Sequence, residues 1–174
     1  MPIEFAVLHK DDVEQSSLYK DAQEIAARLR LFLEEDDTQR LIRERHVLGA
    51  SSAGIQDVIL QTASQLGFES ERKGLFATYA VSALRPDYYC GLGETGILLE
   101  VERGKTIANN MDLLDLWKCH ICEHARYLFL LVPQVRPSAN GSMIRQFAYV
   151  HKRLAPFFEP KNYVNVDAVF LFGY

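Results

Sequence analysis

The stretch RPDYYCGLGETGILLEVERGK, residues 85–105, decides the fold that this sequence predicts. Gly91, Gly93 and Gly96 divide it into a strand, a tight turn and a second strand, which together predict a β-hairpin with a slightly extended loop. Side chains alternate between the two faces of a sheet along a strand, so three aliphatic residues of the second strand, residues 97–102, share one face, and Leu98 shares the other with the two glutamates. The three aliphatic residues are Ile97, Leu99 and Val101.

Three acidic side chains converge in this otherwise apolar hairpin. Glu100 and Glu102 point to the same face with about 6–7 Å between their Cα atoms, and antiparallel pairing brings Asp87 of the first strand beside them. Carboxylates this close repel one another unless a cation compensates them, and a hard divalent cation with oxygen ligands is the usual one. The hairpin therefore predicts either a metal site or an exposed edge whose acidic side chains are solvated.

Length and composition predict one domain, residues 1–174, because 48% of the residues are hydrophobic and the chain is long enough for a sizeable core. The order of elements given below predicts that this domain is α/β. No apolar run approaches the roughly 20 residues that cross a membrane, and the beginning of the chain lacks a signal-peptide pattern, so we expect no membrane partner. Three cysteines, an odd number, argue against a disulfide framework and favour the reducing cytoplasm. The net charge of −4 is not typical of a protein that binds nucleic acid by bulk charge.

An α-helical N-terminal section is expected over residues 1–48. Residues 1–8 suit a short edge strand or an extended arm. Apolar residues recur at helical spacing over residues 18–35, and Thr38 is placed to cap a second helix that continues to residue 46. This section offers a face for packing on a core or for a dimer interface.

The core, residues 49–174, is expected to alternate helices and strands. The predicted order is a helix at 55–66 that Gly67 ends, strands at 68–73 and 75–81, the hairpin, a helix at 111–125, a strand at 127–132, a helix at 143–158 and a strand at 164–172. The helix at 111–125 has an apolar stripe formed by Leu113, Leu114, Trp117 and Ile121. An antiparallel hairpin followed by helical crossovers predicts a mixed β-sheet sandwiched by helices.

This order of elements, with an acid after a proline on one strand and an acid pair on the next, resembles the PD-(D/E)xK nuclease superfamily of restriction endonucleases and of recombination and repair nucleases. The matching residues are Pro86-Asp87 and, after twelve intervening residues, Glu100-Val101-Glu102. As topology the resemblance covers residues 55–174. It implies a restriction-endonuclease-like mixed sheet flanked by helices.

The resemblance also implies a metal centre. Asp87 and Glu100 would hold Mg²⁺, or Mn²⁺, against the scissile phosphate, and Val101 would add its backbone carbonyl as a ligand. Such a metal neutralises developing negative charge and lowers the pKa of the attacking water. The product expected from the family is a 5′-phosphate.

The sequence departs from the commonest family pattern at its third position, which is usually lysine and here is Glu102. Glutamate at this position also occurs in the family, as a base or a second-metal ligand, so the general base and the number of metals stay open. Lys105 lies just beyond the strand, where it can contact phosphate. Lys118, on the following helix, can replace the missing lysine as in some family members, but we favour a solvated surface lysine there.

Residues around the hairpin complete the expected site. Gln56, near the start of the preceding helix, matches family members with Glu or Gln there, although an ordinary exposed glutamine fits as well; the other acids considered are Asp57, Glu69 and Glu71. Basic residues close to the hairpin are predicted to meet a phosphate backbone. They are Lys73, Arg85, Arg103 and Lys105.

A rival metal site lies in the segment CHICEH, residues 119–124, where His120 and His124 have the i, i+4 spacing that can chelate zinc. Cys119 and Cys122 have no second pair elsewhere, because Cys90 is the only other cysteine. We therefore interpret these cysteines as small buried apolar residues and the histidines as hydrogen-bonded structural groups, and we do not expect zinc.

The function expected from the sequence is a metal-dependent endonuclease that acts on DNA, with Asp87, Glu100, Glu102 and Lys105 as catalytic residues. Cleavage of both strands by a domain of this size favours a homodimer, with the N-terminal helices as its interface. Two alternatives stay open. One is a catalytically inactive relative that binds DNA or protein, and the other is a zinc-binding regulatory domain.

Overall fold

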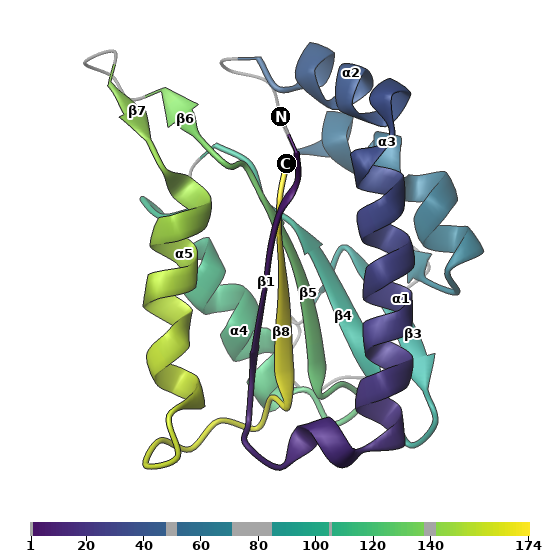
Figure 1. Cartoon of the computed structure of the whole chain (residues 1–174), viewed down its shortest axis with the longest axis vertical. Helices are drawn as coiled ribbons and strands as arrows, with labels where there is room; N and C mark the ends of the chain where they lie inside the picture. The colour runs from purple at the N-terminus through teal and green to yellow at the C-terminus, as the bar shows by residue number, and fades with distance from the viewer. Residues whose placement is uncertain (1, 48–51, 71–84, 105, 138–141) are drawn as a thin grey trace.

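The computed structural model of the chain describes residues 2–47, 52–70, 85–104, 106–137 and 142–174 (Figure 1). Its helices are α1 (Ser17–Glu34), α2 (Asp36–Arg45), α3 (Ala53–Gln65), α4 (Met111–Ile121) and α5 (Gln146–Leu154), with 3₁₀ turns η1 (Val13–Gln15) and η3 (Ala155–Phe158). Its strands are β1 (Glu4–His9), β2 (Glu69–Ser70), β3 (Tyr88–Leu92), β4 (Thr95–Val101), β5 (Tyr127–Val132), β6 (Arg136–Pro137), β7 (Met143–Ile144) and β8 (Ala168–Gly173).

Six of these strands form one mixed sheet in the order β1-β8-β5-β4-β3-β2. Strands β2, β3 and β4 form an antiparallel meander, β4, β5 and β8 are parallel, and β1 pairs antiparallel with β8 at the edge. Parallel neighbours need crossover connections, which α4 supplies between β4 and β5 and α5 between β5 and β8. The predicted mixed α/β sheet is therefore confirmed.

Helices cover both faces of the sheet (Figure 1). The face towards α1, α2 and α3 forms one apolar cluster, and the face towards α4 and α5 forms another. All six residues of β5 are buried, as expected for a strand with helices on both sides. Among the described residues, no helix combines the length and apolar character that crossing a bilayer requires.

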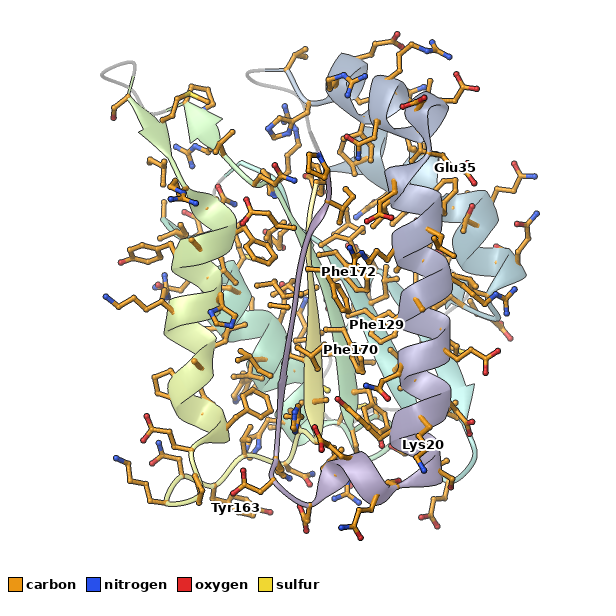
Figure 2. All side chains as sticks on the ribbon, viewed as in Figure 1. Lys20, Glu35, Phe129, Tyr163, Phe170 and Phe172 are labelled. Atoms are coloured by element: carbon orange, nitrogen blue, oxygen red, sulfur yellow. The ribbon has the colours of Figure 1, made fainter. Side chains whose placement is uncertain are left out.

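Three phenylalanine rings fill the space between the sheet and α1 (Figure 2). The Phe129 ring centroid lies 5.0 Å from that of Phe170 and 5.6 Å from that of Phe172. All three rings are fully buried. Because these rings come from the adjacent strands β5 and β8, they fix the register of the parallel pair as well as its packing against α1.

The hairpin turns more tightly than the sequence indicates. Leu92 pairs with Thr95, which leaves a two-residue loop instead of the extended loop expected, and Gly93 adopts a φ of 59° there. Gly96 allows close packing, since a Cβ at this position would lie 2.7 Å from the carbonyl oxygen of Cys90. The alternation within β4 is as predicted: Leu99 and its neighbours of the same parity face α1, whereas Leu98 faces α4.

Several helix boundaries differ from the predicted ones. Helix α2 begins at Asp36, so Thr38 lies inside the helix and Glu35 is its N-cap residue. Segment 143–158 is not one helix, because Met143 and Ile144 form a strand with Arg136 and Pro137 before α5 begins. Strand β2 covers only the start of the strand predicted at 68–73. The rest of that strand and the strand predicted at 75–81 fall outside the described residues.

The end of α3 agrees with the prediction that Gly67 stops this helix. Gly67 has a φ of 90° and donates its N–H to the Ser64 carbonyl oxygen at 3.1 Å, while Phe68 donates to Ala63 at 2.9 Å. This pair of bonds is a Schellman motif, which satisfies the last helical carbonyl groups and turns the chain towards β2.

Helix α4 turns a different face to the sheet than predicted. Its buried residues are Asp112, Asp115, Leu116 and Cys119. Leu114 and Trp117, which the sequence places in an apolar stripe, are 40% and 45% exposed. The helix also ends at Ile121, four residues before the predicted end. This rotation buries two acidic side chains, Asp112 and Asp115.

We predict that Phe129→Ala destabilises the fold by about 3–5 kcal/mol, because it empties the centre of the buried ring cluster. Leu31→Ala, at a position of α1 that is 65% exposed, is the control and should change the unfolding free energy by less than about 0.5 kcal/mol. Urea denaturation measures both variants. Equal effects would contradict the position of the core described above.

Candidate functional site

The carboxylates of Asp87 and Glu100 accept backbone hydrogen bonds across the hairpin, near the end of β4. Tyr88 pairs with Leu99, so Asp87, directly before β3, lies beside Glu100. The Val101 N–H donates to Asp87 Oδ2 at 2.8 Å, and the Asp87 N–H donates to Glu100 Oε2 at 3.2 Å. The structure therefore brings together Asp87, Glu100 and Val101. It shows Val101 engaged through its N–H, while its carbonyl stays a predicted metal ligand.

A lysine from α4 completes this group. Lys118 Nζ donates to Glu100 Oε1 and to Asp115 Oδ1, both at 2.9 Å. The three side chains are 11%, 4% and 0% exposed respectively. The interpretation of Lys118 as a solvated surface lysine is therefore wrong: it is an interior cation that joins the helix to the sheet.

Asp115 was not predicted as a site residue. Its signal in the sequence is the i, i+3 spacing to Lys118, a spacing at which side chains of opposite charge meet on one helix face. Leu116 and Cys119 lie on the same buried face and give it the apolar surface that packs against the sheet. Because two residues of that face are acidic, hydrophobicity alone does not identify it as the buried face of α4.

Glu102 lies one residue beyond β4 and is held by both its backbone and its side chain. Its N–H donates to the Leu131 carbonyl oxygen at 2.8 Å, and its own carbonyl oxygen accepts the Tyr174 hydroxyl at 2.7 Å. The Thr106 hydroxyl lies 3.4 Å from Glu102 Oε2 as a donor. These bonds hold Glu102 just after β4, where the charges of Asp115 and Asp87 act on its carboxylate.

Burial and mutual repulsion raise the pKa values of these acids. Burial, with the charges of Asp115 and Asp87, raises the pKa of Glu102 to about 8. Burial also raises the pKa of Asp115 to about 6 against the opposing charge of Lys118, and it raises that of Glu100 well above its ordinary range.

Lys118 responds in the opposite way to its surroundings. Burial alone would lower its pKa, but the charges of Glu100 and Asp115 and the hydrogen bonds to both outweigh burial and raise it. Lys118 is therefore a permanent cation at neutral pH.

The donor set fits a hard divalent cation. Glu100 and Asp115 contact the Lys118 ammonium group, and the charges of Asp87 and Asp115 also act on Glu102. Oxygen donors in excess of positive charge suit Mg²⁺ or Mn²⁺. In the described part of the chain, no three His, Cys, Asp or Glu side chains are already arranged as metal ligands, and Glu100 is turned towards Lys118 instead. Metal ligation by Glu100 thus requires sharing this carboxylate with Lys118.

A pocket of about 230 Å³ opens beside Asp87. It is lined by Gln56, Asp57, Leu60, Ser70, Arg85, Pro86, Asp87 and Tyr88. Gln56 and Arg85 therefore share a concave surface with Asp87. Tyr88 is buried, and its hydroxyl donates to the Gln56 carbonyl oxygen at 3.0 Å, which ties α3 to β3.

The prediction that Arg103 contacts a phosphate backbone is wrong for this structure. Arg103 is 8% exposed, its guanidinium donates to the Val47 carbonyl oxygen, and its own carbonyl oxygen accepts Gln146 Nε2 at 3.0 Å. It joins the segment after α2 to the segment after β4. Lys73, Lys105 and Glu71 lie outside the described residues, and Glu69 lies exposed on β2.

The two cysteines of the CHICEH segment belong to the packed interior of the α4 side, whereas Glu123 and His124 are exposed. Cys119 and Cys122 are buried in its apolar cluster, and His120 Nδ1 accepts the Asn165 N–H at 2.9 Å. Because α4 ends at Ile121, His124 lies beyond the helix, so the helical i, i+4 spacing predicted for the two histidines does not occur.

Comparison of the chain with protein-family models, with curated proteins and with solved structures finds no match. Its chemistry is therefore inferred from its own residues and their geometry.

We predict that metal-free protein loses stability as the pH rises from 5 to 8.5, in part through Glu102. An acid whose pKa is raised by folding stabilises the fold most below its unfolded pKa, and this contribution disappears as the pH passes its folded pKa, here about 8. Glu102→Gln removes it, so the variant should lose about 1–3 kcal/mol less than the wild type over this range.

Urea denaturation with chelator at both pH values measures this difference. Glu94→Gln, at the exposed hairpin loop, is the matched control and should follow the wild type. Parallel pH profiles of Glu102→Gln and wild type would contradict the burial of this charge.

Proposed function

We propose that the chain is a metal-dependent endonuclease that hydrolyses phosphodiester bonds in DNA, with a site of the PD-(D/E)xK type. One observation supports this most directly: Lys118 Nζ lies 2.9 Å from Glu100, whose other oxygen is bonded to Asp87. The aspartate, glutamate and lysine of that motif thus gather from three places in the chain. The lysine that the motif position lacks is supplied by α4.

The topology adds a second line of support. Helix α3, the antiparallel strands β2, β3 and β4, and the crossover through α4 to the parallel strand β5 follow the order on which the resemblance was based. The same folds host many functions, so the topology supports the proposal only together with the side chains at the end of β4.

Each residue has a distinct role in the proposed reaction. Asp87 and Glu100 would hold a divalent cation, which would act as a Lewis acid and lower the pKa of an attacking water. Lys118, as a permanent cation, stabilises negative charge that develops on the phosphate and does not act as a base. Glu102, with a pKa of about 8, is mainly protonated at neutral pH in the metal-free site, so it would act as a base only where a bound cation lowers this pKa.

Substrate binding is proposed to use the pocket beside Asp87. Arg85 is exposed and lines this pocket, so it can meet a phosphate next to the scissile one. Lys73 and Lys105 remain proposed phosphate contacts from the sequence alone. Cleavage of both strands needs two sites, for which we propose a homodimer formed through α1 and α2.

A catalytically inactive binding module is the second candidate function. The observation in its favour is the same ion pair, because a lysine that permanently neutralises Glu100 would replace the metal. In that case the chain would retain the fold and bind DNA or protein without cleavage. Metal binding separates the two candidates.

We predict that the wild type binds Mn²⁺ and Mg²⁺ and nicks plasmid DNA, and that Asp87→Ala lowers the nicking rate by at least about 100-fold because it removes a ligand of the metal. Calorimetric titration of both ions, followed by a nicking assay with both proteins, measures this.

Glu94→Ala, which likewise removes one carboxylate but at the exposed hairpin loop, is the control and should bind and nick like the wild type. Absence of both metal binding and nicking in the wild type would favour the binding module. Unchanged nicking by Asp87→Ala would place the catalytic centre elsewhere.

A further inference from the structure

Lys118 and a divalent cation need the same carboxylate. Glu100 uses Oε1 for Lys118 and Oε2 for the Asp87 N–H, and its side chain is almost completely buried. A metal that binds Glu100 places a second positive charge next to the ammonium group and repels it. A lysine on a flexible four-carbon chain then leaves the site unless another group retains it.

Asp115 has the position and the free capacity to retain Lys118. It already accepts a hydrogen bond from Lys118 through Oδ1, and it lies three residues earlier on the same helix. Its other oxygen, Oδ2, is buried and has no hydrogen-bond partner among the described residues. A buried acceptor without a partner is costly, so this oxygen favours any donor that turns towards it.

We infer that Lys118 is the resident cation of the metal-free site, and that Asp115 is the positioning residue that keeps Lys118 there when Glu100 is shared with a divalent cation. The inference rests on the proposed function. Asp115 Oδ2 provides the acceptor for the N–H that Glu100 gives up. Lys118 thereby stays in the interior beside the reacting phosphate, and its charge is available at the same time as that of the metal.

This arrangement assigns different tasks to two aspartates of one helix. Asp112 is equally buried on α4, one turn before Asp115, but its nearest cation is Arg153 of α5, with Oδ2 and Nε 3.4 Å apart. Asp112→Asn therefore removes a buried carboxylate from α4 without changing a partner of Lys118. It is the matched control for Asp115→Asn.

The test is a double-mutant cycle on Mn²⁺ affinity, measured by calorimetry with the ion alone. We expect Asp115→Asn to weaken Mn²⁺ binding about 10-fold when Lys118 is present, because the ammonium then stays on Glu100. In the Lys118→Met background, where no ammonium competes, the same change should weaken binding less than about 3-fold, and Asp112→Asn in the natural background less than about 2-fold.

A second measurement does not depend on the folding of Lys118→Met. Reductive methylation followed by mass spectrometry reports how accessible the Lys118 amine is. In the wild type, we expect low reactivity with and without Mn²⁺. In Asp115→Asn, addition of Mn²⁺ should raise the reactivity of Lys118 several-fold, since the repelled ammonium has no second carboxylate to hold it.

The outcomes separate this inference from the proposed function. If the wild type binds no Mn²⁺, both fail together. If the wild type binds Mn²⁺ but Asp115→Asn costs the same affinity with and without Lys118, or leaves Lys118 as protected as in the wild type, only the role of Asp115 is overturned.

Discussion

The pairing of Lys118 with Glu100 and Asp115 is the interaction on which the organisation of this molecule depends. It joins β4 to α4, and therefore fixes the face that the crossover helix turns towards the sheet. Removing charges from water is expensive, and buried ion pairs often stabilise a fold no better than apolar residues of the same volume. A core that contains more carboxylates than cations contributes even less to the stability of the fold. Such an arrangement is easier to understand as the requirement of a site than as a device for stability.

The same ion pair underlies both functions considered for the chain. If Lys118 is a permanent substitute for a metal, the group is inert and the sheet is a binding scaffold. If Lys118 and a metal share the carboxylates, the group is the metal-free form of a reaction centre. The excess of oxygen donors favours the second view, because one ammonium leaves most of the acidic charge uncompensated. Burial and the neighbouring carboxylates raise the pKa values of Glu102 and Asp115, and the charge of Lys118 only partly opposes this rise. The two candidate functions differ in whether Lys118 alone binds Glu100 or shares it with a metal ion.

The sequence predicted what depends on local pattern and missed what depends on distant partners. The alternation in residues 97–102 was enough to place Glu100 and the hairpin register enough to place Asp87, because both follow from strand geometry. Lys118 was misjudged because the face of α4 that is buried depends on the sheet, and hydrophobicity favoured Leu114 and Trp117 over two aspartates. Arg103 was misjudged because Val47, its partner, is far away in the sequence. The contacts of Lys118 with Glu100 and of Arg103 with Val47 join different elements, so no pattern within one element predicts them.

The position of β1 and β8 has a consequence for the way this chain reaches its folded state. Strand β1 pairs only with β8 in the main sheet, so the first described strand forms its hydrogen bonds with residues near the other end of the described chain. Contacts between such distant segments slow folding, whereas the hairpin of β3 and β4 can form early. Tyr174, directly after β8, braces the backbone of Glu102. The acidic group would therefore assemble in stages, with its hairpin carboxylates in place long before the last support of Glu102 arrives.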